Sequence, residues 1–475
     1  MSDADIYELY IEDISHEGLG VAKLKMDAHA SPIVIFIQGA LPTQKVKAKI
    51  TKRKANFWEG KTLEILDLGQ ALNSRCQMSG CGGCPIQSFP YAEQLKIKTK
   101  LLHTALNRIG QFEKSLLDAC VAQITPSPKI DHYRNKMEFA FGLDQNGEII
   151  LGQRSFHSSQ VVATKNCLLM PEGWAEILNS VQDLANQSQL KPFCPDLSQD
   201  HSARDRGFWR SFILRHGFTV ASQEFSFFAI CLTSQANKEE VHLVRKMGQT
   251  LLNLYPKLAV FIHEERKAND VLAQGEKRLT TLTQPGLEPY LELPLGEKRF
   301  VLDPSNFFQV NLDAAQFIWQ ILVKFLDDIK TDTWSLLDLY SGVGAPSLLL
   351  ASRFKSVLGL EINPKSVRCA QKNVTRFDLK NCTFKALPIE RLLTNIDYAD
   401  IVLADPPRQG LGGKNCQAIL KIAPKDILYI SCNPTTLARD LNYLSAKYSV
   451  QKIYPIDLFP HTIHLETVSI LTMKT

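Results

Sequence analysis

The sequence predicts a three-part chain that ends in a doubly wound α/β domain, preceded by a small β-barrel of OB type and an α+β central domain. From about residue 300 onward, short apolar strands alternate with helix-length segments, which is the pattern of a mostly parallel sheet. The first residues instead form short runs rich in β-branched side chains, separated by Gly and Pro. The stretch between them mixes both patterns, and its topology stays open. We therefore predict domains over residues 1–66, 67–300 and 301–475.

The composition of the chain is typical of a globular protein and argues against a membrane protein. Of its 475 residues, 45% are hydrophobic and 22% are charged, and no run of 18 apolar residues occurs. The N-terminus "MSDADIYELY" lacks the pattern of a signal peptide, so the eleven cysteines are expected to be thiols or metal ligands. We expect a cytoplasmic protein with no membrane association and no obligate protein partner.

The N-terminal segment has an uneven charge distribution that favours nucleic-acid binding. The net charge is only +5, but residues 1–27 carry seven acidic residues, and residues 45–61 carry seven Lys and Arg against one Glu. Phe57 and Trp58 lie within this basic strip, which suits a phosphate backbone and stacked bases. OB-type barrels commonly carry this function. The alternative is a solvated hairpin face.

A cysteine-rich loop predicts a metal site at the start of the central domain. The segment "SRCQMSGCGGCPIQ" contains Cys76, Cys81 and Cys84, and a fourth cysteine, Cys167, lies far downstream. Three thiols in a Gly-rich loop can wrap an ion, and the spacing alone fits a [2Fe–2S] cluster or zinc. Three basic residues in nearby candidate strands are expected beside this segment: Arg134, Lys136 and Arg154. For Arg134 and Lys136 the alternatives are a surface that faces RNA and a solvated strand face.

The C-terminal domain opens with a glycine turn that predicts a nucleoside-binding site. The segment "LLDLYSGVGAPSLLLA" is an apolar strand, a Gly342-x-Gly344 turn and a helix, and such glycines let the backbone approach a ligand. The next strand ends in Glu361, which is placed to bind ribose hydroxyls. A third glycine is missing, since Ser347 takes its place. This favours S-adenosylmethionine, which has no pyrophosphate, over NAD.

Two later strands end in residues that can carry chemistry. "DIVLADPP" ends in Asp405 before two prolines, which form a rigid rim, and "DILYISCN" ends in Cys432. A thiolate added to C6 of a uracil makes C5 reactive enough to accept a methyl group. Glu466 opens the last strand and is a candidate proton acceptor. The alternatives are a packing role for Cys432 and loop-positioning roles for His461 and His464.

Five segments together resemble the S-adenosylmethionine-dependent RNA 5-methyluridine methyltransferases. They are "DPSNFFQVN" (303–311), "DLYSGVG" (338–344), "DPPRQGL" (405–411), "SCNPTTLARD" (431–440) and "DLFPHTIHLE" (457–466). The resemblance implies a Rossmann-like class I methyltransferase domain in which Cys432 is the nucleophile, Glu466 is the base and Asp405 orients the uracil. It also implies a set of contacts to S-adenosyl-L-methionine: Gln309, Tyr340, Gly342, Gly344, Glu361 and Asp405.

The resemblance extends to the first two domains. Many members of this family carry a [4Fe–4S] cluster on such a loop, which implies that Cys76, Cys81, Cys84 and Cys167 are its ligands. The segment "ISHEGLGVAK" (14–23) resembles the TRAM module, an RNA-binding β-barrel. The chain departs from the family pattern at a few donor contacts: Ser341, Ala345, Pro346, Leu387 and Pro388.

These observations predict an RNA uracil-C5 methyltransferase that forms 5-methyluridine in 23S rRNA. Three alternatives stay open at this point. The first is the same reaction on tRNA. The second is methylation of an exocyclic base amine at the rim formed by Asp405 and its two prolines. The third is a non-catalytic Fe–S protein that binds RNA.

Overall fold

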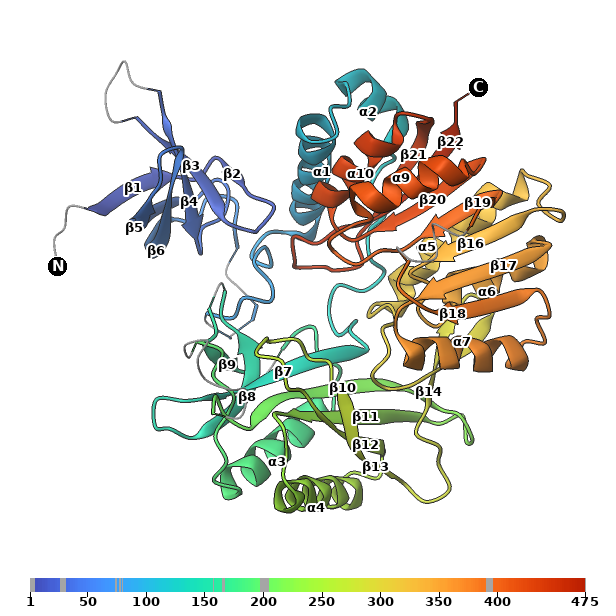
Figure 1. The fold of residues 1–475 in the computed structure, drawn as a ribbon. Helices are drawn as coiled ribbons and strands as arrows, with labels where there is room; N and C mark the ends of the chain where they lie inside the picture. The colour runs from blue at the N-terminus through green and yellow to red at the C-terminus, as the bar shows by residue number, and fades with distance from the viewer. Residues whose placement is uncertain are drawn as a thin grey trace.

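The computed structural model describes residues 5–25, 31–72, 75–76, 78, 80–156, 158–164, 167–196, 205–389 and 396–474. Within these residues the strands form three sheets, of six, nine and seven strands, which follow one another along the chain (Figure 1). No helix in the described part of the chain combines the length and the apolarity that a membrane span requires.

The N-terminal sheet has the order β1-β5-β6-β4-β3-β2 and gives the predicted small β domain. Its strands are β1 (Ile6–Tyr10), β2 (Asp13–Ile14), β3 (Gly20–Leu24), β4 (Ile33–Gln38), β5 (Lys45–Arg53) and β6 (Phe57–Asp67). The basic strip falls on β5, where alternate residues are buried, so Val46, Ala48 and Ile50 enter the core while the lysines face outward.

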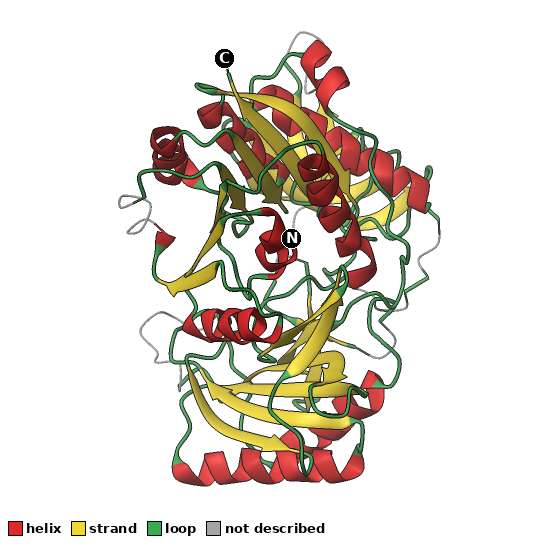
Figure 2. Ribbon diagram, turned by 90° about the vertical axis from the view of Figure 1, so that its right-hand side faces the viewer, coloured by secondary structure: helices red, strands yellow, loops and turns green. Residues whose placement is uncertain are grey.

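The central domain is a mixed sheet with two helices packed on one face (Figures 1 and 2). Its strands are β7 (Lys136–Leu143), β8 (Ile149–Arg154), β9 (Val161–Ala163), β10 (Trp209–Thr219), β11 (Phe225–Thr233), β12 (Leu258–Glu265), β13 (Lys277–Thr283), β14 (Leu291–Leu295) and β15 (Lys298–Leu302). Its helices are α3 (Trp174–Gln187) and α4 (Lys238–Leu254), and α4 makes the crossover between the parallel strands β11 and β12.

Two helices that precede the central sheet pack against the C-terminal domain instead. They are α1 (Tyr91–Arg108) and α2 (Lys114–Cys120). Leu102 and Leu106 of α1 share a core with Leu437 and Leu441 of a C-terminal helix, and Figure 1 shows α1 beside it. These helices lie inside the stretch 67–300 that the sequence groups with the central domain, and the domain boundaries stay a prediction.

The C-terminal domain is the predicted doubly wound sheet, with strand order β18-β17-β16-β19-β20-β22-β21. Its strands are β16 (Ser335–Leu339), β17 (Ser356–Glu361), β18 (Cys382–Ala386), β19 (Ile401–Ala404), β20 (Asp426–Ser431), β21 (Tyr448–Ile456) and β22 (Glu466–Met473). The helical segments are α5 (Leu312–Asp327), α6 (Ala345–Leu350), η2 (Ala351–Arg353), α7 (Pro364–Arg376), α9 (Gly412–Ile422) and α10 (Pro434–Leu444).

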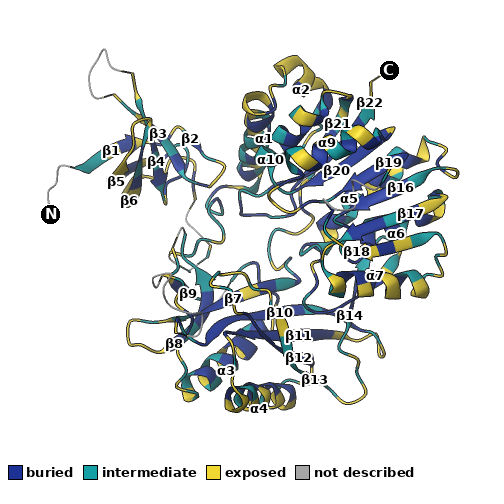
Figure 3. Cartoon of the chain, in the orientation of Figure 1, coloured by how far each residue is buried: buried dark blue, intermediate teal, exposed yellow. Residues whose placement is uncertain are grey.

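The central strands of this sheet are buried on both faces, as Figure 3 shows. Alternate residues of β19 enter two different cores, Val402 on the side of α9 and α10 and Leu403 on the side of α5. This explains why these strands read as continuous apolar runs rather than as alternating ones. The first five strands in this order are parallel, so their carboxyl ends meet at one edge.

Candidate active site

The carboxyl edge of the C-terminal sheet brings four predicted residues side by side. Leu339, Leu360 and Ala404 are paired across β16, β17 and β19, so Tyr340, Glu361 and Asp405 leave the sheet at the same level. Ala404 pairs with Tyr429 on the next strand, β20, which ends two residues later, immediately before Cys432. Residues far apart in the chain therefore line one edge.

The antiparallel strand β22 completes this edge with a carboxyl group. Ser431 pairs with Thr467, so Cys432 and Glu466 lie next to each other where β20 ends and β22 begins. The Thr467 hydroxyl donates a hydrogen bond to the Ser431 carbonyl at 3.1 Å, which fixes this register. Glu466 is only 2% exposed, and among the described residues its Oε1 has no hydrogen-bond partner. Burying a carboxyl oxygen without a partner costs stability. Groups of this kind cluster at functional sites, so Glu466 is a candidate catalytic group.

The charges at this edge are not compensated. Burial, with Asp405 nearby, raises the pKa of Glu466 well above its ordinary value, and burial raises the pKa of Asp405 to about 7. Burial and the same two carboxyls raise the pKa of the Cys432 thiol to about 12, against the opposing effect of Arg408. In the free protein the thiol is therefore protonated at neutral pH, and the two carboxyls ionise less readily than exposed ones.

The loop that precedes Glu466 is held from α1. Lys98 forms a fully buried ion pair with Asp457 at 2.5 Å and donates to the Phe459 carbonyl at 2.9 Å. His461 has a left-handed backbone with φ 71°, and its Nε2 lies 3.0 Å from Asp131. These contacts show His461 positioning the loop that leads into β22.

The second histidine of this loop is neutral. Burial and the nearby Arg408 lower the pKa of His464 to about 3. Its Nε2 lies 3.1 Å from the guanidinium of Arg408, the cation that opposes the raised pKa of the Cys432 thiol. His464 therefore sits between the loop and the catalytic edge.

A cavity of about 70 Å³ lies over the glycine turn. Tyr340, Gly342 and Gly344 all have left-handed backbones, with φ of 62°, 54° and 79°, and a Cβ on Gly344 would lie 2.7 Å from the Phe384 ring. The lining includes several predicted donor contacts: Gln309, Tyr340, Gly342 and Asp405. The glycines adopt this conformation without strain, whereas Tyr340 does not, and a strained residue at a cavity wall is typical of a binding site.

The predicted ribose-binding acid lies beside this cavity rather than in its lining. Glu361 accepts hydrogen bonds from the backbone N–H groups of Gly342, at 3.1 Å, and Asn363, at 2.7 Å. Its carboxylate thus holds the glycine turn against the end of β17. Among the departures from the family pattern, Ala345 and Pro346 line the cavity, while Leu387 does not and is 42% exposed.

A larger groove of about 660 Å³ runs from the central domain to the loop that precedes Glu466. Arg134, Lys136 and Arg154 line it from the central domain, as does His464 from the loop before Glu466. Phe307 lines both this groove and the cavity over the glycine turn, and it is 67% exposed. Three of its charged lining residues are basic and two, Glu17 and Glu138, are acidic. The groove therefore offers cations to a polyanion beside the loop that leads to Glu466.

The four cysteines of the predicted cluster line one cavity, in which Arg134 and His461 also take part. Burial raises the pKa of three of their thiols, Cys81, Cys84 and Cys167. Within the described residues, no group of three or more His, Cys, Asp or Glu side chains is arranged to hold a metal ion. The four thiols thus share one cavity, although among the described residues they do not form a ready site for a single metal ion.

Comparison with known proteins identifies the family. The profile of the tRNA (Uracil-5-)-methyltransferase family matches residues 262–474, and that of the TRAM domain matches residues 5–63. A Clostridium tetani protein named as an uncharacterized RNA methyltransferase is 32% identical, and the alignment covers 98% of both chains. One of the same description from Nitratidesulfovibrio vulgaris is 31% identical over 93% of this chain and 92% of the relative. The chain belongs to the RNA uracil-5-methyltransferase family.

A solved structure shares the fold of this chain over nearly its whole length. The chain is similar to the Pyrococcus abyssi tRNA (uracil-54, C5)-methyltransferase solved with S-adenosyl-L-homocysteine, with a TM-score of 0.71 at 21% identity. The match covers 98% of this chain and 99% of that one. The predictions of an S-adenosylmethionine-dependent RNA methyltransferase and of a TRAM domain are confirmed.

The structure of this methyltransferase also reveals supporting residues that the motifs do not mark. Lys98 and Gln94 hold the loop before Glu466, since the Gln94 side chain accepts from the His461 N–H at 2.8 Å. The signal was present in α1, where Gln94, Lys98 and Leu102 repeat every four residues on its buried face. Polar residues at core positions of an amphipathic helix indicate buried partners.

Proposed function

We propose that this methyltransferase forms 5-methyluridine in 23S rRNA through a covalent bond between Cys432 and the target uracil. The observation that carries the proposal is the pairing of Ser431 with Thr467, which sets Cys432 beside Glu466 at the same edge as Asp405. A nucleophile, a base and a polar group for the uracil then lie next to the cavity over the glycine turn. We further propose that the protein works in the cytoplasm, where thiols stay reduced.

In the proposed reaction Cys432 acts first, as the nucleophile, and Glu466 acts last, as the base. The Cys432 thiol releases its proton to solvent and its sulfur bonds to C6 of the uracil, while the electrons of the C5–C6 double bond move to the C4 oxygen. C5 then attacks the methyl group of S-adenosylmethionine, and S-adenosylhomocysteine leaves. The carboxylate of Glu466 takes the C5 proton, and the electrons released expel the Cys432 thiolate and restore the double bond.

The raised pKa of the thiol is consistent with this order of events. Burial, and then the nearby Glu466 and Asp405, disfavour a thiolate in the free protein. A bound uracil can donate its N3–H to Asp405, which reduces the repulsion felt by the thiolate. The nucleophile is therefore expected to ionise only once the base is in place, so the free enzyme is protected from oxidation.

We propose that the donor occupies the cavity over the glycine turn. Gln309, Tyr340 and the two glycines would surround it, and Glu361 would exchange one of its backbone partners for the ribose hydroxyls. Phe307, shared by the cavity and the groove, would stack on the flipped base between donor and thiol.

The four-cysteine cavity supports a proposal for the predicted [4Fe–4S] cluster. Cys76, Cys81, Cys84 and Cys167 would hold it and thereby fix the loop beside the groove. Replacing Cys81 by Ser is expected to remove the brown chromophore and bound iron, measured by absorption and iron assay. The exposed Cys194, also in the central domain, gives a matched Ser control that should keep both. Colourless wild-type protein purified without oxygen would contradict the cluster.

A second candidate function is the same reaction on tRNA. It is favoured by the matching family, which is named for tRNA, and by the tRNA enzyme of similar fold. The combination of a TRAM domain with a cluster loop favours rRNA by analogy. Mapping 5-methyluridine in both RNAs of a deletion strain separates the two, because only the true substrate loses its methyl group.

The covalent mechanism is tested with RNA that carries 5-fluorouridine. Fluorine cannot leave C5 as a cation, so methyl transfer should leave the enzyme bound to the RNA, visible as a donor-dependent complex in a denaturing gel. Cys432→Ala should give no complex. Cys416→Ala, a buried cysteine in the same domain, should still be trapped. A wild-type enzyme that turns over yet is never trapped would favour the exocyclic-amine reaction.

A further inference from the structure

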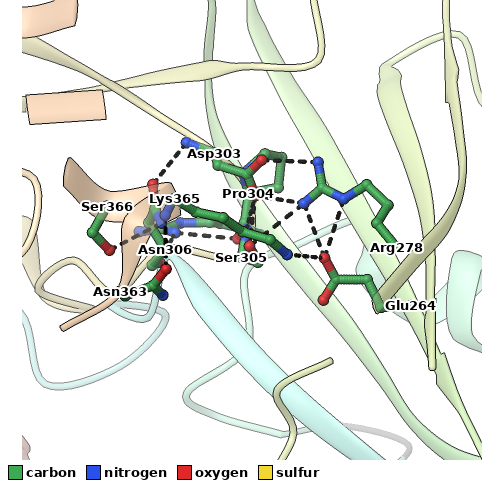
Figure 4. Close-up of polar contacts among 10 residues, drawn as sticks. Glu264, Arg278, Asp303, Pro304, Ser305, Asn306, Asn363, Lys365 and Ser366 are labelled. Carbon is green, nitrogen blue, oxygen red and sulfur yellow. Dashed lines mark hydrogen bonds and ion pairs between the residues drawn. The ribbon is translucent and has the colours of Figure 1, made fainter. Parts of the chain in front are cut away.

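A buried ion network lies between the central sheet and the C-terminal sheet (Figure 4). Arg278 of β13 binds both oxygens of Asp303, at 2.8 and 2.7 Å, and also contacts Glu264 of β12 at 3.0 Å. Lys365 of α7 contacts the same oxygen of Glu264 at 2.8 Å. The side chain of Glu264 is 2% exposed and that of Asp303 is 10% exposed, so water screens these contacts little.

One end of this network fixes the segment that forms a wall of the donor cavity. Asp303 accepts from the N–H and hydroxyl of Ser305, and Asn306 donates to Ser366 at 3.2 Å. The buried Arg215 of β10 donates to the Asn306 carbonyl at 2.6 Å. The next residues, 307–309, line the cavity, so the position of this wall depends on side chains of the central sheet.

The other end reaches the opposite side of the same cavity. Lys365 lies in the first turn of α7, whose N-cap is Asn363. The Asn363 N–H donates to Glu361, and Glu361 accepts from the Gly342 N–H in the glycine turn. A chain of contacts therefore runs from the glycine turn through Lys365, Glu264, Arg278 and Asp303 back to the wall at 307–309.

We infer that Glu264 and Arg278 are positioning residues for the methyl-donor site, although both belong to the central domain and neither lines the cavity. This inference rests on the proposed donor site. It means that the donor site is completed by the central domain, and that donor affinity depends on how the two sheets are joined. Arginine is suited to this place because its planar fork can hold Asp303 with two bonds and Glu264 with the rest, which lysine cannot do.

The chain offers a matched control on the same helix. Arg376, at the other end of α7, pairs with the buried Glu292 of β14 at 2.6 Å. This pair also joins α7 to the central sheet, but it contacts neither the segment 303–309 nor the loop 361–363 in the described residues. Replacing either arginine by Gln leaves a buried carboxylate unpaired, so both variants should lower the unfolding temperature.

The experiment measures S-adenosylhomocysteine binding by calorimetry and donor KM with an RNA substrate. Arg278→Gln should weaken binding and raise donor KM by about 10-fold or more, with a smaller change in kcat. Arg278→Lys should fall between it and the wild type, and Arg376→Gln should change affinity less than about 2-fold. Glu264→Gln, which keeps the Arg278–Asp303 pair and the shape of the site, should weaken binding by about 3-fold.

The outcomes separate the inference from the proposed function. Wild-type affinity in Arg278→Gln or Glu264→Gln would overturn the inference while leaving the donor site intact. An equal loss in Arg376→Gln would also overturn it, because the effect would then come from loosening α7 as a whole. A wild-type protein that does not bind S-adenosylhomocysteine would overturn the donor site itself.

Discussion

Two groups of buried carboxyls in this protein have opposite electrostatic surroundings. At the catalytic edge, Asp405 and Glu466 have no ion-pair partner among the described residues, and burial raises the pKa of both. Between the sheets, burial alone would raise the pKa of Asp303, but the ion pair with Arg278 holds it below its ordinary value. In these two places, the paired charges join elements of the fold, whereas the carboxyls without an ion pair lie at the catalytic edge.

The largest loss of stability is expected where a buried carboxylate loses the cation that is paired with it. Lys98→Met would leave Asp457 buried without its cation, below the loop that leads to Glu466. The free energy of unfolding of the C-terminal domain is expected to fall by about 3–5 kcal/mol, measured by chemical denaturation.

The control for this variant lies on the same helix. Lys96 pairs with Glu93, but its side chain is 72% exposed. Lys96→Met should therefore change the free energy of unfolding by less than about 0.5 kcal/mol. Equal effects of the two substitutions would show that the buried pair has no special structural role.

The opposite change, removing an unpaired charge, should stabilise the protein. In Asp405→Asn the side chain stays neutral at every pH, whereas the wild-type group has a folded pKa of about 7 against an unfolded value of about 4. Folding of the wild type therefore takes up a proton between these values, and its stability falls as pH rises through this window. The variant should gain on the order of 1 kcal/mol, or ~2–4 °C in Tm, at pH 8, and almost nothing at pH 4.

Thermal melts of both proteins from pH 4 to pH 8 test whether the gain in Tm of the variant grows as the pH rises. The variant is expected to be inactive even as it becomes more stable, which is the usual relation between strain at an active site and stability. A gain of the same size at pH 4 would mean that packing, rather than charge, explains the difference.

The same distinction explains what the sequence could predict. The parallel sheet was predictable because β16, β19 and β20 are buried on both faces and read as apolar runs. Glu466 could be singled out as a candidate base at the start of the last strand, but its pairing next to Cys432 could not be derived. Strand β22 inserts antiparallel between β20 and β21, and no local pattern fixes that insertion.

The ion network between the two sheets was harder still to predict from the sequence. Arg278 and Glu264 lie in ordinary-looking strands, and their partners Asp303 and Lys365 come from elsewhere in the chain. Helix α1 carried a readable signal in the buried Lys98, but its packing partner could not be read from residues near it. Local sequence predicts elements, whereas long-range polar pairs depend on the assembled fold.

The TRAM domain also contains both paired and unpaired charges, here on its surface. On the outer side of its sheet, Lys45 pairs with Glu8 and Arg53 pairs with Asp5. Lys49 and Lys61 face each other across β5 and β6, and within the described residues neither has an ion pair. Like charges directly opposite each other destabilise a sheet, so we interpret this pair as a contact for RNA phosphate.

Replacing Lys49 or Lys61 by Ala should weaken RNA binding a few-fold, equally for RNAs of different sequence. The slope of log affinity against log salt should fall in magnitude by ~1 for each lysine removed, measured by filter binding over a salt series. Lys45→Ala is the matched control, because its charge is already compensated by Glu8 and should add little to the slope. If Lys45→Ala and Lys49→Ala reduced the slope equally, ion pairing within the sheet would not decide which lysines meet the RNA, and the distinction between paired and unpaired charges would hold only for the buried sites.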